Sequence, residues 1–403
     1  MATLLAILPL LLSLHPLLSS AAPRDTLLPG SSLSVNKYQT DILRSRDGTF
    51  TCGFNSIYTN AFTFSIWYTH SSKTVVWTAN CGRPVHARAA AVTLKKGSAL
   101  VLTDYDGAVV WQAQGDNSVG VQYAQLLETG NLVMKNSSGI VVWQSFDSPT
   151  DTLLPTQRIT ATTKLVSTTG LHVPGHHIFH FTDSSILSLL YDDADVHEIY
   201  WPDPDNGEYQ NNRNRYNNTR FGGLDDTGNF FSSDFANQQA LVASDQGLGI
   251  KRRLTLDPDG NLRLYSLNSS NGGWMVSWIA MSQPCNIHGL CGPNGICHYL
   301  PAPTCFCPPG YVMNNPGNWS QGCSLQVDIN CTIDQVQPVQ FVPLPGTDFW
   351  GSDQQHYDQI SLKACKNKCR RDCTCKGFVY WQGTGSCYLK SFLFSGKAYT
   401  PKS

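Results

Sequence analysis

The chain has 403 residues, a formal net charge of −1 and only 14% charged residues. Average soluble proteins carry roughly 25%, so this low and balanced charge argues against nucleic acid or an anionic membrane surface as the partner. The length suits roughly two to four domains. No long stretch has helical periodicity, and a mainly β chain is expected.

Residues 1–22 have the composition of a secretory signal peptide. An apolar run ends in the small residues Ala21 and Ala22, while Pro9 and Pro16 argue against a transmembrane helix. No later stretch is apolar for long enough to span a bilayer. We therefore expect a secreted, extracellular protein. N-glycosylation sequons agree with this, at Asn136, Asn217, Asn268, Asn318 and Asn330.

Between residues 62 and 143, one strand–turn–strand pattern is written three times and ends each time in Val-Val-Trp. The copies close at Trp77, Trp111 and Trp143, and residues 97–111 align with residues 129–143 without a gap. A single hairpin with one apolar face is unstable alone. We therefore predict three sheets around a common axis, with the tryptophans in one shared core.

The segment 156–280 repeats the pattern less regularly, for example at residues 186–201 and 254–267. From its residues alone this segment predicts β structure of unassigned architecture, and only the family resemblance given below leads us to expect a second, more divergent domain of the same kind. Its histidines cluster at His172, His176, His177 and His180. On a helix, His176 and His180 would be neighbouring metal ligands, but the surrounding Pro, Gly, Ile and Phe favour a strand, where they would lie roughly 13 Å apart. No metal site is expected.

The cysteines are unevenly placed. Cys52 and Cys81 stand alone, whereas the others lie between Cys285 and Cys387, which predicts small disulfide-stabilised modules there. Within them, Ser361 suits a helix N-cap, and Cys365 and Cys369 share one helical face. Cys52 and Cys81 are either a local bridge or two free thiols. We expect the bridge, because secretion oxidises neighbouring thiols.

Residues 30–155 resemble a bulb-type (mannose-binding-like) lectin domain, a β-prism. Residues 141–155, VVWQSFDSPTDTLLP, resemble the segment that follows it in plant S-locus glycoproteins and G-type lectin receptor-like kinases. Further stretches resemble that family in its order, at residues 252–267, 285–297, 305–311 and 375–388. The resemblance implies a mainly β chain with two tandem β-prism II domains, an EGF-like module and a PAN/apple module.

The implied divisions are a signal peptide (1–22), a bulb-type lectin domain (23–155), an S-locus glycoprotein domain that is a second prism (156–282), an EGF-like module (283–324) and a PAN module (325–403). Relatives continue beyond the end of this sequence with a final PAN strand, a transmembrane helix and a kinase. We therefore expect a C-terminally truncated PAN module, a chain released without an anchor, and poor order in its last ten or so residues.

Disulfide pairs also follow from the resemblance. The EGF-like pattern implies Cys285 with Cys297, Cys291 with Cys305, and Cys307 with Cys323. The PAN pattern implies Cys365 with Cys387 and Cys369 with Cys375, which leaves Cys331 for Cys373. The residues before Cys285 lack the acidic side chains of calcium-binding EGF modules, so no calcium or other cofactor is expected.

A bulb-type lectin that binds mannose would carry Gln-x-Asp-x-Asn-x-Val-x-Tyr in each repeat. In the first domain only the packing Val and Asn131 survive, so mannose recognition is not expected there. A third partial match lies in the second domain, with Arg263 in place of Val. The alternative is that Asp-Pro-Asp-Gly-Asn is an ordinary turn. The candidate ligand-binding residues are Asn131, Asp257, Asp259, Asn261 and Tyr265.

The resemblance implies a recognition ectodomain without its own kinase, because the kinase motifs are missing, as are the motifs of common hydrolases. Its ligand would be a carbohydrate, a protein or peptide, or a partner receptor. Implied partners are membrane-bound S-domain receptor kinases or a second copy in a homodimer. One alternative is a secreted defence or storage lectin for mannose-type glycans. Another is a glycosidase with Asp192 and Glu198 as its paired carboxylates.

Overall fold

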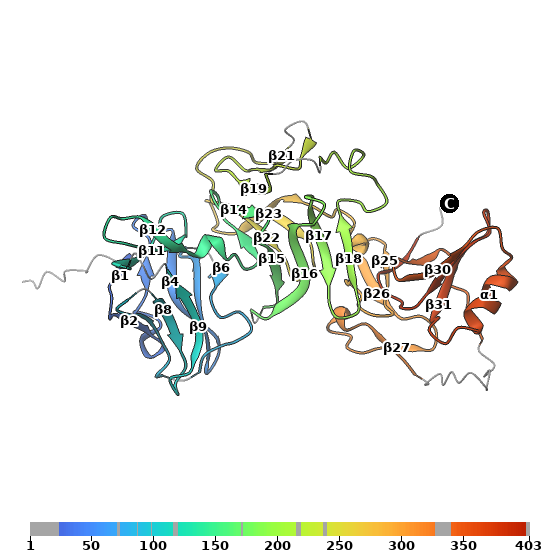
Figure 1. The fold of residues 1–403 in the computed structure, drawn as a ribbon, viewed down its shortest axis with the longest axis horizontal. Coiled ribbons are helices and arrows are strands. Elements are labelled where there is room, and N and C mark those ends of the chain that lie inside the picture. The colour runs from blue at the N-terminus through green and yellow to red at the C-terminus, as the bar shows by residue number, and fades with distance from the viewer. Residues whose placement is uncertain are drawn as a thin grey trace, which may run out of the picture.

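Regular structure in this chain is almost entirely β. The computed structural model describes residues 24–70, 73–86, 88–97, 99–115, 120–170, 172–214, 219–236, 240–326 and 340–399. The predicted signal peptide and the sequons at Asn217 and Asn330 lie outside them. Two three-sheet prisms and two disulfide-rich modules follow one another from left to right in Figure 1. The mainly β fold class is confirmed.

The first prism consists of three four-stranded antiparallel sheets, each completed by a short strand from an earlier part of the chain. One contains β3 (Leu43–Arg44), β4 (Phe50–Tyr58), β5 (Ala61–Tyr68) and β6 (Val75–Thr78). The next contains β2 (Ser32–Ser34), β7 (Ala91–Leu94), β8 (Ala99–Thr103) and β9 (Val109–Gln114). The third contains β1 (Thr26–Leu27), β10 (Tyr123–Leu126), β11 (Leu132–Lys135) and β12 (Val141–Gln144). Short 3-10 helices are η1 (Val35–Lys37) and η2 (Ser145–Asp147).

Trp77, Trp111 and Trp143 lie on β6, β9 and β12 and meet in one cluster. Their ring centroids are 5.8 Å apart for Trp77 and Trp111, 5.9 Å for Trp111 and Trp143, and 6.4 Å for Trp77 and Trp143, all edge-to-face. The Trp77 indole also donates to the Ser148 carbonyl at 2.9 Å. Edge-to-face packing adds stability beyond the buried area. The predicted shared tryptophan core is confirmed.

The second prism has the same three-sheet plan with a different core. One sheet contains β13 (Thr152–Leu153), β22 (Arg252–Leu256), β23 (Leu262–Leu267) and β24 (Trp274–Ile279). The next contains β14 (Arg158–Thr160), β19 (Phe221–Leu224), β20 (Asn229–Ser232) and β21 (Ala240–Val242). The third contains β15 (Leu165–Thr168), β16 (Pro174–Phe181), β17 (Leu187–Asp192) and β18 (His197–Trp201). Phe179, Phe230 and leucines such as Leu254 fill its centre in place of a tryptophan triad.

The EGF-like module is small and held by disulfides. It contains η4 (Pro284–Asn286), β25 (Ile296–Tyr299), β26 (Pro303–Phe306), β27 (Tyr311–Met313), η5 (Trp319–Gln321) and β28 (Cys323–Leu325). Its bridges are Cys285–Cys297, Cys291–Cys305 and Cys307–Cys323. These are the pairs that the resemblance implies.

The PAN module packs one helix on a three-stranded sheet. It contains β29 (Thr347–Phe349), β30 (Asp353–Tyr357), α1 (Leu362–Arg370), β31 (Gly377–Trp381), β32 (Ser386–Lys390) and β33 (Gly396–Ala398). The Ser361 hydroxyl caps α1 by accepting from the Ala364 amide at 3.2 Å. The bridges Cys365–Cys387 and Cys369–Cys375 follow the implied pairing. Cys373 is also disulfide-bonded, but Cys331 lies outside the described residues.

The expectation that the last ten or so residues are poorly ordered is wrong for residues 396–398, which form β33, whereas residues 400–403 lie outside the described residues. β33 pairs in parallel with β25 of the EGF-like module and antiparallel with β29 of the PAN module. The sheet order β26-β25-β33-β29 therefore runs across both modules. The backbone groups at the edge of β25 are satisfied in this way, which is why the segment is ordered as a strand.

The expected bridge between Cys52 and Cys81 is also wrong, because both thiols are free. Cys52 lies on β4 opposite Ile66 of β5, whereas Cys81 follows β6 on the other side of β5. Strands two apart in a sheet are separated by roughly 10 Å, beyond the roughly 7 Å limit for bridged Cα atoms. Cys81 instead donates to the His172 carbonyl of the second prism at 2.9 Å.

We predict that replacing Trp77, Trp111 or Trp143 with Ala lowers the free energy of unfolding by roughly 3–5 kcal/mol, because each change opens a cavity in the shared cluster. Denaturant unfolding of the single variants measures this loss. The matched control is Trp381→Ala, since Trp381 is 57% exposed. Equal stability of the core variants and the control would contradict a shared core.

Candidate functional site

Asn131, the candidate in the first prism, is a buried anchor of its hairpin. Its amide Nδ2 donates to Gln144 Oε1 at 2.8 Å, and its Oδ1 accepts from the Ser145 hydroxyl at 3.1 Å and the Phe146 amide at 3.3 Å. The residue is 6% exposed. Its polar atoms are engaged in holding β12 to β11, so they do not face a ligand.

Asn261 has the same role in the second prism. It is fully buried; its Nδ2 donates to the Met281 carbonyl at 2.8 Å, and its Oδ1 accepts from the Met281 amide at 3.0 Å. The Asn261 side chain, just before β23, therefore holds the segment of chain that follows β24. The sugar-recognition motif and this structural turn both have an Asn at this position, so the sequence alone does not distinguish them.

The remaining three candidates do come together, around the residue that departs from the sugar motif. Arg263 donates to Asp257 at 2.6 Å and to both oxygens of Asp259 at 2.9 and 2.6 Å. Asp257 also accepts from the Tyr265 hydroxyl at 2.7 Å. These four residues, which we call the Arg263 cluster, lie on the outer side of the turn and of β23. Charge-assisted, bidentate bonds hold them in one geometry.

Burial sets the protonation behaviour of this cluster. Desolvation raises the pKa of Asp257 above its usual value, and hydrogen bonds from Arg263 and Tyr265 only partly offset it. Desolvation also raises the pKa of Tyr265, to about 12, so the hydroxyl keeps its proton. The Asp259 side chain is 37% exposed. Asp259 is therefore the carboxylate of the cluster that solvent or a ligand reaches most readily.

A cation–aromatic stack extends this face of the sheet toward the first prism. The Arg253 guanidinium lies 3.9 Å from the Tyr265 ring centroid and 4.9 Å from that of Trp274. Trp274 in turn donates to the Thr74 hydroxyl of the first prism at 2.8 Å and packs on Tyr68 at 4.9 Å. The outer face of β22, β23 and β24 thus carries one continuous polar and aromatic surface up to the prism junction.

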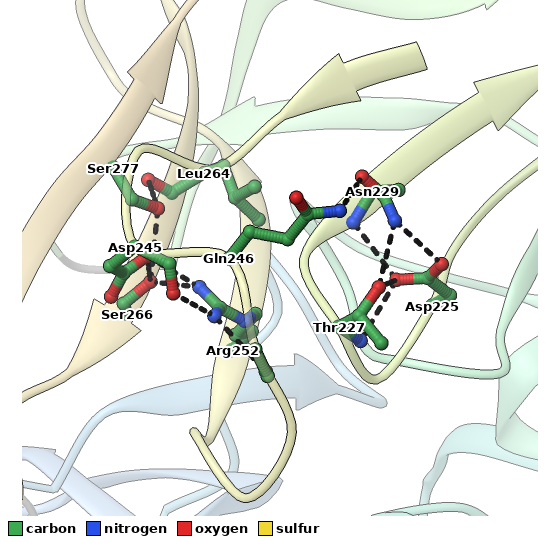
Figure 2. Close-up of polar contacts among 10 residues, drawn as sticks. Asp225, Thr227, Asn229, Asp245, Gln246, Arg252, Leu264, Ser266 and Ser277 are labelled. Carbon is green, nitrogen blue, oxygen red and sulfur yellow. Dashed lines mark hydrogen bonds and ion pairs between the residues drawn. The ribbon is translucent and has the colours of Figure 1, made fainter.

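A second polar network lies at the equivalent turn before β20, where sequence reasoning found no candidate. Asp225 Oδ1 accepts from the Thr227 hydroxyl at 2.8 Å, the Asn229 amide Nδ2 donates to Thr227 at 2.7 Å, and Gln246 donates to Asn229 Oδ1 at 2.8 Å (Figure 2). The letters Asp-Asp-Thr-Gly-Asn at 225–229 match Asp-Pro-Asp-Gly-Asn at 257–261. This repeated pattern, with Asp, Gly and Asn at the same three positions, was the sequence signal that could have identified the second network.

Beside this network, Figure 2 shows a buried ion pair that supports β22. Arg252 is fully buried and meets Asp245 at 2.7 Å through both a carboxylate oxygen and the backbone carbonyl. Burial opposes ionisation of Asp245, but hydrogen bonds from Arg252 and Ser266 outweigh it and lower the pKa of this carboxyl. Removing one partner of such a pair leaves an uncompensated charge, so its role is structural.

The paired carboxylates of the glycosidase hypothesis are not a pair. Asp192 contacts His197 at 2.9 Å, whereas Glu198 contacts His288 of the EGF-like module at 3.3 Å. His197 and Glu198 are consecutive on β18, so their side chains point to opposite faces of the sheet. Asp192 and Glu198 therefore cannot flank one glycosidic bond.

The histidine-rich segment forms β16 from Pro174, as its composition predicts. His177 is buried and its Nε2 lies 2.8 Å from the His288 carbonyl, while His176 contacts the Asp192 carbonyl at 3.2 Å. Over the described ranges, no three His, Cys, Asp or Glu side chains are grouped to hold a metal ion.

The described sequons differ in accessibility. Asn136 is 5% exposed, and its Oδ1 accepts from the amides of Ser138 and Ile140 within the β11–β12 turn. This burial argues against a glycan at Asn136. Asn268 is half-buried and Asn318 is exposed, so these two positions remain the predicted glycosylation sites.

Three families match consecutive parts of the chain. Residues 74–172 match the D-mannose binding lectin family, residues 213–315 the S-locus glycoprotein domain and residues 331–398 the PAN domain. These are non-catalytic domain types. Across the described segments, no helix has the length and apolar character needed to cross a membrane.

Curated relatives match most of the length of this chain. A putative receptor protein kinase of Zea mays, ZmPK1, is 59% identical over 386 residues, which are 94% of this chain and 47% of that protein. A G-type lectin S-receptor-like serine/threonine-protein kinase of Arabidopsis thaliana is 31% identical over 87% of this chain and 44% of its own length. The chain thus spans about half the length of these kinases. It covers 83% of an S-locus-specific glycoprotein of Brassica oleracea, at 26% identity.

Among solved structures, a monomeric mannose-binding lectin of Gastrodia elata is 17% identical over 30% of this chain and 96% of its own, with a TM-score of 0.22. A two-domain lectin, the Scilla campanulata agglutinin, is 16% identical over 64% of this chain and 96% of its own, also with a TM-score of 0.22.

The contact between His177 and the EGF-like module predicts a pH dependence of stability. Desolvation lowers the pKa of His177 to about 4, although the hydrogen bond to the His288 carbonyl opposes this. In the unfolded chain a histidine titrates near 6.5, so the unfolded state takes up the proton first as pH falls. The free energy of unfolding therefore does not depend on His177 protonation above about pH 6.5, and it falls by roughly 3 kcal/mol as the pH decreases toward 4.

Denaturant unfolding at pH 7 and pH 4.5 tests this for the wild type, His177→Gln and the exposed control His70→Gln. We expect the pH-dependent loss to shrink only in His177→Gln, because glutamine keeps a donor but does not titrate. An identical loss in all three proteins would exclude His177 as the cause.

Proposed function

Because the chain is a lectin-like S-domain protein of the family that includes G-type lectin S-receptor-like kinases and S-locus glycoproteins, we propose that it is a non-catalytic extracellular recognition module. Its disulfide-bonded C-terminal modules support an oxidising, extracellular compartment. Its second prism carries the surface that supports ligand recognition best. The observation that carries this proposal is the Arg263 cluster.

The Arg263 cluster is suited to recognition because its polar groups are organised before a ligand arrives. Bidentate contacts from Arg263 fix Asp259, so little side-chain entropy is lost when a ligand hydroxyl or amide donates to this carboxylate. Beside it, the Tyr265 ring and the stacked Arg253 offer a flat surface on which an apolar sugar face or a peptide side chain packs. Both a glycan and a peptide fit these groups.

Mannose recognition of the storage-lectin type is less well supported. Its motif uses the Asn side chain to bind sugar hydroxyls, yet Asn131 and Asn261 are buried and hydrogen-bonded inside their own hairpins. The glycosidase alternative is also disfavoured, because its two carboxylates, Asp192 and Glu198, lie on opposite faces of a sheet.

We expect Asp259→Ala to reduce ligand binding at least about tenfold, because it removes the accessible acceptor of the cluster and releases Arg263. The measurement is binding of the purified chain to a glycan array and to a library of extracellular peptides. Asp106→Ala is the matched control, since Asp106 holds the same place in the Asp-Tyr-Asp-Gly turn of the first prism. If Asp259→Ala binds the same probes as strongly as the control, the ligand does not use this cluster.

A second function, association with a membrane-bound relative or a second copy, is supported by exposed apolar side chains. The β25–β26 hairpin carries Leu300 at its tip, 65% exposed and next to the exposed Tyr299, and the exposed Phe306 at the opposite end of β26. Large exposed apolar side chains on one hairpin are typical of a protein contact.

Light scattering of the chain alone, and mixed with the ectodomain of a related receptor kinase, measures this association. We expect Leu300→Glu to weaken any complex at least about tenfold, because it places a charge in the contact. Leu248→Glu is the control, since Leu248 is 76% exposed on the second prism, away from this hairpin. A complex that survives Leu300→Glu would place the contact elsewhere.

A further inference from the structure

A small cavity lies at the end of β18 in the second prism, apart from the Arg263 cluster. Its volume is about 310 Å³, at the lower end of the range for small-molecule sites. Its walls come from the end of β18, the loop that follows, and β21. The residues that matter for its chemistry are Trp201, Asn211, Asn212, Arg213, Phe235 and Leu241.

Arg213 is the unusual member of this wall, because its charge is almost completely removed from water. Its side chain is 5% exposed, and the guanidinium lies 4.5 Å from the Trp201 ring centroid and 4.2 Å from the Phe235 ring centroid. Its Nε is buried without a hydrogen-bond partner in the described part of the chain. Arg44, Arg252 and Arg253 also have a buried Nε without a partner, so what distinguishes Arg213 is its position in the wall of this cavity.

Among the described residues, the carboxylate paired with Arg213 is Asp234, and it compensates this charge incompletely. Asp234 approaches the guanidinium only to 3.5 Å, and its oxygens already accept from the Leu187 amide at 3.0 Å and from the Ser232 hydroxyl. Desolvation therefore prevails over this ion pair and lowers the pKa of Arg213 to about 10. A second anion at the cavity would recover part of the electrostatic energy that burial costs.

The other residues of the cavity wall determine which ligand groups fit beside that anion. Phe235 and Leu241 are apolar, and the Asn212 side chain is exposed, with no hydrogen bond to another described residue. Asn212 has φ of +54°, a left-handed conformation that Asn tolerates and that holds it at this loop. Asp203 lies at the rim, but its oxygens accept from the Asp205 amide and the Asn206 side chain, both at 3.1 Å.

Asn211 Nδ2 already donates to the carbonyls of Asp203 and Asn206, at 2.8 and 3.0 Å, which leaves the Asn212 amide for a ligand. We propose that this cavity binds an acidic monosaccharide, with the carboxylate against Arg213, a ring hydroxyl on the amide of Asn212, and the apolar ring face on Phe235 and Leu241. A uronic acid combines these three features in one small ligand. The site does not depend on the function proposed for the Arg263 cluster, because no residue is shared between them.

The test compares glucuronate with glucose, which share a ring and differ in the carboxylate, by saturation-transfer NMR and calorimetry on the whole chain. We expect glucuronate to bind at least about tenfold more tightly than glucose, and Arg213→Gln to remove that preference. Arg158→Gln is the matched control, since Arg158 stacks on Phe221 at 5.3 Å on an exposed surface. It should leave the preference unchanged.

Ala240→Trp tests the site without altering Arg213. Ala240 lines the cavity from β21, so a large side chain there should fill it and abolish glucuronate binding while the protein stays folded. Equal affinity for glucose and glucuronate, no detectable binding of either, or glucuronate binding that survives both Arg213→Gln and Ala240→Trp would overturn the proposal. Asp259→Ala should bind glucuronate normally, which separates this test from that of the Arg263 cluster.

Discussion

The need of each four-stranded sheet to cover one apolar face organises the whole chain. A single sheet leaves that face in water, whereas three sheets around a common centre bury all three at once. The first prism does this with leucine, valine and phenylalanine packed with three edge-to-face indoles, and the second with phenylalanine and leucine. Because the inner faces are used up by this packing, recognition chemistry is confined to the outer faces and to the turns.

Polar side chains in the turns of this chain mostly hydrogen-bond within their own turn or hairpin. This separates structural polar residues from those that are available to a ligand. The amides of Asn131 and Asn261 bond inside their own hairpins, and the Asp225 network closes on itself. A ligand would have to break these bonds without replacing them. The Arg263 cluster and the Arg213 cavity differ, because an accessible carboxylate in one and an undercompensated cation in the other leave capacity for a ligand.

The second prism is the hub that positions the other modules. Toward the first prism, the Tyr68 hydroxyl donates to the Arg252 carbonyl at 2.9 Å. Toward the EGF-like module, His177 and Glu198 both meet His288. Gly351 of the PAN module lies directly against the Glu198 carboxylate, so a side chain at this position would have to displace that carboxylate. With β33 joining the last two modules in one sheet, the row of modules in Figure 1 is held by specific contacts at each junction.

Local patterns in the sequence determined the strands, the first three-sheet domain, the tryptophan core and the capped PAN helix, because strand alternation, hairpin turns and capping depend on neighbours in the chain. The second three-sheet domain was expected only with the help of the family resemblance. Family resemblance supplied the disulfide pairs. Tertiary structure alone decided that Cys52 and Cys81 lie on opposite sides of β5, that β33 completes a sheet with β25, and that Asn261 turns inward while Asp257 and Asp259 gather on Arg263. These outcomes depend on contacts between residues distant in sequence, and on which side of a turn is buried, for which a single sequence has no local signal.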